Sequence, residues 1–114
     1  MNNIPASSAH FYSPAGITFD ALGNLYIADA GYNIILKIDA SIGIISTVAG
    51  ESAGGGGGYT CDNCAATSSE LAEPQSVAID GAGNLYIADT RNSLIRKVVA
   101  GTGIITTVAG LPPF

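Results

Sequence analysis

The stretch GNLYIADAGYNIILKI at 23–38 recurs with few changes as GNLYIADTRNSLIRKV at 83–98. Each copy is followed by a matching segment, GIISTVAG at 43–50 and GIITTVAG at 103–110, so the offset is 60 residues throughout. Across the aligned units, 19 of 37 positions are identical. A fixed period indicates a protein built from structural repeats that stack on their neighbours. The repeat therefore predicts the architecture, but it says little about an activity.

The composition is that of one globular domain of 114 residues. The apolar fraction of 47% is enough for a packed core, whereas the charged fraction of 11% is low. Globular chains usually carry about 25% charged residues, so this chain must bury much of its surface or offer it to a neighbour. The net charge of −5 argues against general binding to nucleic-acid phosphates. Three of the four basic residues lie close together, and we expect them to form a solvated patch: Arg91, Arg96 and Lys97.

Each unit is predicted to form four short antiparallel strands. The expected strands are 16–20, 24–29, 33–39 and 44–49 in the first unit, and 76–80, 84–89, 93–99 and 104–109 in the second. Short β-branched runs between glycine-containing turns are typical of antiparallel meanders. Segments such as Leu25–Ala28 and Ile34–Leu36 are apolar throughout, which predicts sheets covered on both faces. Small sheets with a neighbour on each face are typical of β-propeller blades.

The chain is expected to divide into two blades and a linker. Residues 1–50 should hold a linker tail and the first blade, residues 51–73 a glycine-rich inter-blade linker, and residues 74–114 the second blade. The opening residues lack the charged and apolar regions of a signal peptide. No apolar run reaches the roughly 18–20 residues that span a bilayer, so we expect a soluble chain with no membrane partner.

These residues resemble the NHL repeat, most closely that of bacterial NHL-repeat proteins. The resemblance lies in a proline, an apolar-x-Asp strand, the GNLYIAD segment, an I-x-K-I or I-x-K-V strand and the TVAG close. Linkers of that family usually read G-D-G-G-P-A-T-S-A-x-L. Here residues 61–71 read CDNCAATSSEL, with Cys61 and Cys64 at two glycine positions and an alanine at the proline. The resemblance covers roughly residues 5–110 and implies all-β propeller blades, typically six to a ring.

Two blades are too few to close a propeller, which needs about four to eight. Each end of a two-blade unit should therefore expose a broad apolar face. We expect copies of the chain to assemble head to tail, with a homotrimer completing a six-bladed ring. A four-bladed dimer, a domain-swapped assembly and a piece of a longer propeller stay open as alternatives.

Two sets of residues could carry chemistry. The first is a set of aspartates that recurs in both units: Asp20, Asp29, Asp80 and Asp89. Because they repeat, we expect them to accept backbone N–H bonds at turns rather than to form a cation-binding ring. The second set is Cys61 and Cys64, which can supply at most two of the four ligands of a structural zinc site. A thioredoxin-type redox motif needs a βαβ setting, so free thiols or a local disulfide are expected instead.

Other polar features carry weaker signals. The run Gly54–Gly58 lacks the lysine and hydroxyl residue that follow the glycines of a P-loop, so we expect a flexible linker. His10 aligns with Glu70 in the second unit, so nothing marks it as catalytic. The two units differ in the turn between their second and third strands, which makes this turn a candidate ligand-facing surface: Ala30, Gly31, Tyr32, Thr90, Arg91 and Asn92.

We therefore expect a non-enzymatic propeller module without a cofactor, which acts as a structural or binding scaffold. Its partners should be copies of itself and a protein or small ligand on a propeller face, and a nucleic acid is not expected. The resemblance leaves two alternatives open. One is a metal-dependent lyase or hydrolase, and the other is an RNA-binding domain, which would need a basic face.

Overall fold

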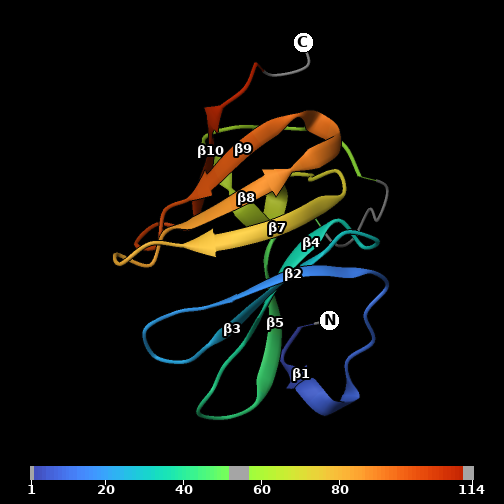
Figure 1. The fold of residues 1–114 in the computed structure, drawn as a ribbon, viewed down its shortest axis with the longest axis vertical. Helices are drawn as coiled ribbons and strands as arrows, with labels where there is room; N and C mark the ends of the chain where they lie inside the picture. The colour runs from blue at the N-terminus through green and yellow to red at the C-terminus, as the bar shows by residue number, and fades with distance from the viewer. Residues whose placement is uncertain (1, 52–56, 112–114) are drawn as a thin grey trace.

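The computed structural model describes residues 2–51 and 57–111 as an all-β protein of two antiparallel sheets (Figure 1). The first sheet has the strand order β1–β5–β4–β3–β2 and the second β6–β10–β9–β8–β7, so the two units share one topology. The strands of the first sheet are β1 (Ile4–Pro5), β2 (Pro14–Phe19), β3 (Leu25–Asp29), β4 (Ile34–Ile38) and β5 (Ile44–Ala49). Those of the second are β6 (Cys64–Ala65), β7 (Pro74–Ile79), β8 (Leu85–Asp89), β9 (Leu94–Val98) and β10 (Ile104–Ala109).

Each sheet has five strands, one more than the four that the sequence predicts. The four predicted strands of each unit are present, with bounds shifted by up to two residues. In each sheet the additional strand is a two-residue segment, which precedes the four longer strands in the sequence and pairs with the last of them. Ile4 lies opposite Ile45 in the first sheet, and Cys64 lies opposite Ile105 in the second. The segment predicted as a linker therefore contributes a strand to the second blade.

Short 3₁₀ turns accompany these strands: η1 (Ala6–Ser8), η2 (Ala66–Ser68) and η3 (Thr90–Asn92). None of the helical turns in the described segments is long and apolar enough to cross a membrane. Of the predicted flexible run Gly54–Gly58, residues 54–56 lie outside the described residues.

The two sheets pack against each other, with the inner strands β2 and β7 side by side (Figure 1). Gly16 in β2 makes this approach possible. A Cβ atom added there would lie 2.8 Å from the carbonyl oxygen of Gln75 in β7. A residue without a Cβ is therefore required where the inner strands meet. The core between the blades combines side chains of both sheets with part of the linker, among them Tyr26, Ile35, Leu71, Ile87 and Ile105.

Equivalent apolar positions differ sharply in exposure between the two blades. Val77 of the second blade is 6% exposed because the first blade covers it, whereas its equivalent Ile17 is 62% exposed. In the opposite sense, Ile35 is 0% exposed and its equivalent Ile95 is 39% exposed. Each blade thus has two apolar faces, of which the internal contact covers one.

Candidate functional site

The first pair of repeated aspartates holds the turn between the first two long strands of each blade. Asp20 accepts hydrogen bonds from the backbone N–H groups of Leu22 and Asn24, from Asn24 Nδ2 and from the Tyr26 hydroxyl, at 2.9–3.1 Å. Asp80 accepts the same set in the second blade, from Ala82, Asn84 and Tyr86. The side-chain bond from Asn24 or Asn84 is the main reason why the pKa of each carboxyl is lowered. Both carboxylates thus hold turns.

The second pair of aspartates fixes the chain where it enters the inner strand. Asp29 is fully buried and accepts the backbone N–H groups of Tyr12 and Ser13, each at 2.9 Å. Asp89 is equally buried, and it accepts the N–H of Ala72 at 2.7 Å. Its other oxygen, however, accepts bonds from two side chains, Nδ2 of Asn92 and Nη1 of Arg96. The second blade therefore adds a cation at a position where the first has only neutral donors.

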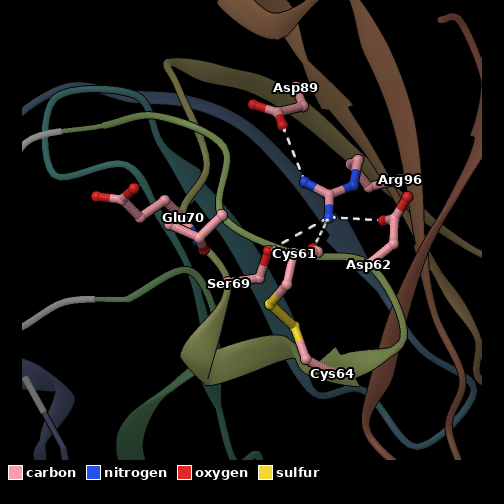
Figure 2. Close-up of a disulfide and its surroundings, with 8 residues drawn as sticks. Cys61, Asp62, Cys64, Ser69, Glu70, Asp89 and Arg96 are labelled. Carbon is pink, nitrogen blue, oxygen red and sulfur yellow. Dashed lines mark hydrogen bonds and ion pairs between the residues drawn. A yellow bond between two sulfur atoms is a disulfide. The ribbon is translucent and has the colours of Figure 1, made fainter. Parts of the chain in front are cut away.

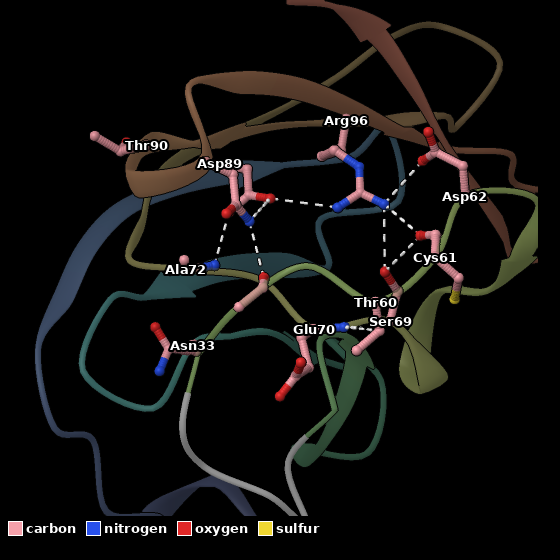
Figure 3. A network of polar contacts seen from close by, with 12 residues as sticks. Asn33, Thr60, Cys61, Asp62, Ser69, Glu70, Ala72, Asp89, Thr90 and Arg96 are labelled. Atoms are coloured by element: carbon pink, nitrogen blue, oxygen red, sulfur yellow. Dashed lines mark hydrogen bonds and ion pairs between the residues drawn. The ribbon is translucent and has the colours of Figure 1, made fainter. Parts of the chain in front are cut away.

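Arg96 is fully buried in the second blade, so the prediction of a solvated basic patch was wrong for this residue. Its Nη1 donates to Asp89 Oδ2 at 3.3 Å, and its Nη2 donates to Asp62 Oδ1 at 2.9 Å. Nη2 also donates to the carbonyl of Cys61 at 2.8 Å and to Ser69 Oγ at 3.3 Å (Figure 3). The Tyr59 ring lies 4.7 Å from the guanidinium, a cation–π contact. We call Arg96, Asp62, Asp89, Ser69 and the Cys61 carbonyl the arginine cluster.

Burial and hydrogen bonding act on Asp62 in opposite directions. Burial raises the pKa of its carboxyl, and hydrogen bonds that include those from Tyr59 and Arg96 outweigh it, so the pKa is lowered overall. Asp62 thus carries the negative charge that Arg96 needs. Among the described residues Arg96 Nε has no hydrogen-bond partner, so the guanidinium depends on its two terminal nitrogens.

Cys61 and Cys64 form a disulfide beside the arginine cluster (Figure 2). Of the two states that the sequence left open, the structure has the disulfide. Cys61 supplies the carbonyl that accepts from Arg96, and the same carbonyl accepts the Ser69 hydroxyl at 2.9 Å. Cys64 lies in β6, at the edge of the sheet. The disulfide therefore joins the loop above Arg96 to the outermost strand of the blade.

A groove of about 520 Å³ lies between the two blades, at the turns that join β3 to β4 and β8 to β9. Four of the six candidate ligand-facing residues line it: Ala30, Gly31, Arg91 and Asn92. The other two do not. Tyr32 packs edge-on against Tyr12, which itself lines the groove, and Thr90 is exposed beside it.

Polar side chains converge on this groove. Arg91 Nε pairs with Glu73 Oε2 at 3.2 Å, and both side chains are exposed. Glu73 has a φ of 49°, a left-handed conformation that costs a non-glycine residue about 1 kcal/mol or more. Its N–H donates to Asn33 Oδ1 at 2.7 Å, which ties the wall formed by the second blade to the first. Asn92 donates to the carbonyl of Gly58 as well as to Asp89, which links the groove to the arginine cluster.

The groove can offer both donors and acceptors to a polar ligand, and the Arg91–Glu73 pair adds no net charge. Its volume lies in the range of small-molecule sites. Within residues 2–51 and 57–111, no group of three or more His, Cys, Asp or Glu side chains could hold a metal ion. The sequence predicted the turn residues from their variation between units. It gave no sign of Glu73 or Asn33, because their contact forms only when the blades pack.

Comparison with known proteins gives a consistent result. The family model described as NHL repeat matches residues 71–98. NHL repeat-containing protein 2 of Gallus gallus is 38% identical over 111 residues, which are 96% of this chain and 14% of that protein. The chain thus spans about a seventh of this curated relative.

Two solved β-propeller structures share the fold. A protein of unknown function from Bacteroides thetaiotaomicron has a TM-score of 0.69 at 23% identity, over 86% of this chain and 24% of that one. Virginiamycin B lyase from Staphylococcus aureus has a TM-score of 0.63 at 18% identity, over 99% of this chain and 31% of that one. At such identities the likeness concerns the fold alone.

Proposed function

Because this chain is built from NHL repeats, we propose that it is a non-enzymatic propeller module that assembles head to tail with copies of itself. Three two-blade chains would complete a six-bladed ring, within the range of blade numbers that close. The observation that supports this proposal is the exposure of the same two faces that the chain already packs together internally.

Inside the chain, the face of the first blade that bears Tyr26 and Ile35 packs on the face of the second that bears Val77. The equivalent of the first face is open on the second blade, at Ile95 and Val108. The equivalent of the second face is open on the first blade, at Ile17 and Phe19. The second blade of one copy can thus pack on the first blade of the next and repeat the internal contact. Such a contact is heterologous and closes into a ring when the rotation per copy divides the circle.

The chemistry of the open faces suits another blade. Ile17, Phe19 and Val108 are 62%, 60% and 50% exposed, and large side chains of this kind gain free energy when a neighbour removes them from water. The first blade covers part of its open face with the preceding segment, where Ile4, Ala6 and Ala9 pack beside β4 and β5. This is how the linker of the second blade packs, with Ala66 and Leu71 in the core between the blades.

The test is the mass of the chain in solution, measured by light scattering after size exclusion. One chain is 11.4 kDa, and we expect a single species of about three times that mass at micromolar concentration. A stable monomer would contradict the proposal and would favour the alternative that neighbouring repeats of a longer chain cover both faces. A species of two chains would favour a four-bladed ring.

An enzyme is the second candidate, and the observation that favours it is the similarity in fold to virginiamycin B lyase. If this chain belonged to a metal-dependent lyase or hydrolase, the assembled protein should hold a metal through residues of more than one copy. Elemental analysis of the purified assembly tests this, and stoichiometric metal would overturn the non-enzymatic proposal. Binding of RNA is disfavoured further by the burial of Arg96, which leaves Arg91 and Lys97 as the accessible pair of that basic group.

A further inference from the structure

The loop closed by the Cys61–Cys64 disulfide supplies two of the four hydrogen-bond partners of the buried Arg96. Nη2 donates to the carbonyl of Cys61 and to Asp62, which lies between the two cysteines in sequence. Ser69, its third partner, itself donates to the same Cys61 carbonyl. Displacement of this loop would leave the guanidinium with Asp89 as its one carboxylate partner among the residues that the structure describes.

The first blade has neither a cation nor a cysteine at the equivalent place. Leu36 stands at the position of Arg96, Ile4 at that of Cys64 and Ala9 at that of Ser69. All three belong to an apolar cluster on the first blade. Within this chain, the buried cation and the disulfide therefore occur together in one blade and are both absent from the other.

A disulfide across so short a loop constrains the unfolded chain less than one that closes a long loop. Its main effect is therefore local, because it fixes where the Cys61 carbonyl and the Asp62 carboxylate lie. Both cysteines are partly exposed, so a reductant in solution can reach them. The loop is thus accessible on one side and supports a buried charge on the other.

We propose that the Cys61–Cys64 disulfide is a redox-operated latch that holds the loop 61–62 over Arg96. An external dithiol reduces it by thiol–disulfide exchange. The dithiol becomes a disulfide, two electrons pass to the cysteine sulfurs, and each sulfur takes up a proton. The freed loop can then move away from Nη2. A buried cation that loses a partner is strongly destabilised, so this movement favours opening of the blade around Arg96.

Opening of the latch has two structural consequences. It releases β6 from the edge of β10, where the N–H of Asn63 donates to the carbonyl of Ile105 at 2.7 Å. It also disturbs Asp89, which holds the Asn92 side chain that bonds to Gly58 in the wall of the groove. The proposal concerns one blade alone and does not depend on the assembly of copies.

Amide hydrogen exchange of Asn63 measures the opening, and Asn3 is an internal control because its N–H donates to Ile45 in the same way in the first blade. A hydrogen bond to a charged group is worth enough to change an opening equilibrium about tenfold. We therefore expect reduction by a small dithiol to accelerate exchange at Asn63 about tenfold and to leave Asn3 unchanged. The double variant Cys61→Ser/Cys64→Ser should exchange like the reduced protein and should not respond to the dithiol.

Arg96→Leu tests whether the effect of the disulfide depends on the buried cation. The variant has in the second blade the residue that the first blade has at this position. Reduction should accelerate exchange at Asn63 much less in this variant than in the natural chain. Equal acceleration in both proteins, or no acceleration in either, would refute the proposal. If Arg96→Leu fails to fold, Asp62→Asn serves instead: it keeps the arginine and removes the charge that the latch positions, so reduction should again add less.

Discussion

At the scale of single residues, the turn aspartates illustrate how a repeated carboxylate stabilises a repeated hairpin. The ionised carboxylates of Asp20 and Asp80 accept hydrogen bonds at both oxygens, and these bonds lower their pKa values. A carboxyl whose pKa is lower in the folded than in the unfolded chain contributes stability above its unfolded pKa. That contribution is lost as the pH falls through the folded value.

We therefore expect the free energy of unfolding to decrease as the pH falls below about 4, the region where unfolded aspartates bind protons. Urea titrations at a series of pH values measure this dependence. Asp80→Asn should lower the stability at neutral pH and should weaken the dependence on pH. Glu51→Gln, which changes an exposed carboxylate outside the turns, should do neither. A stability that is constant from pH 7 to pH 3 would contradict this account.

The buried aspartates allow a matched comparison between the two blades. Asp29→Asn disturbs a site with neutral backbone donors, whereas Asp89→Asn also removes the charge next to Arg96. We expect a loss of about 1–3 kcal/mol for Asp29→Asn and about 3–5 kcal/mol for Asp89→Asn. In an Arg96→Leu background, the cost of Asp89→Asn should fall to that of Asp29→Asn. Denaturant unfolding of the variants measures all of these values, and equal costs for the two single variants would show that Arg96 does not depend on Asp89.

The sequence predicts the turn aspartates because their bonds are local, within six positions along the chain. The arginine cluster could not be predicted in the same way. Its ion pair with Asp62 joins residues 34 positions apart, and the loop that brings them together has no periodic pattern. One signal was available, since Arg96 aligns with Leu36 and stands between Leu94 and Val98 on the same face of its strand. A charge at a repeated core position indicates a buried partner nearby.

At the scale of elements, the packing of the inner strands depends on the lack of a side chain at Gly16. The strands β2 and β7 come so close that a Cβ at this position would overlap the backbone of Gln75. Backbone atoms cannot yield as the end of a flexible side chain can. One residue of the inner strand, Gly16, therefore determines how closely the two blades approach each other.

Gly16→Ala should force the inner strands apart and lower the stability by about 1–3 kcal/mol, the usual cost of overpacking. Gly81→Ala is the matched control, because a Cβ there meets nothing within 4 Å. That substitution should be neutral or slightly stabilising, since it reduces the freedom of the unfolded chain. Thermal or urea unfolding of both variants gives the comparison. Equal stability of the two variants would mean that the blades can move apart without cost.

The long strands could be predicted because runs of β-branched residues between glycine turns determine them locally. The two-residue strands β1 and β6 could not. Ile4 is in a strand only because Ile45, 41 positions later, pairs with it. A segment this short gains its conformation from the edge on which it lies, and no periodicity can reveal such an edge.

At the scale of the whole molecule, the two sheets pack together and leave two unlike open faces, which are the faces that would meet in the proposed ring. Strands that are apolar throughout predict that each sheet has a neighbour on both faces. The exposed side chains identify the two faces that no neighbour covers within one chain. The number of blades that close the ring depends on the rotation between neighbouring blades. The close contact at Gly16 limits how the two blades can be placed, and it joins strands far apart in the sequence, so no local pattern reveals it.

Glutamate on either open face should prevent copies from associating. Ile17→Glu changes the first-blade face and Ile95→Glu the second-blade face, and neither side chain is buried within one chain. An isoleucine removed from water contributes about 1.5–3 kcal/mol, and an unpaired carboxylate in its place adds a penalty for lost hydration. Light scattering should therefore give the mass of a single chain for both variants. Leu22 lies on a turn and is 83% exposed, so Leu22→Glu should keep the assembled mass.

A mixture of the two variants gives a further test, because a head-to-tail contact joins unlike faces. The mixture can form only the contact between the two unchanged faces, so association stops at two chains. A ring in either variant would show that copies meet through other surfaces.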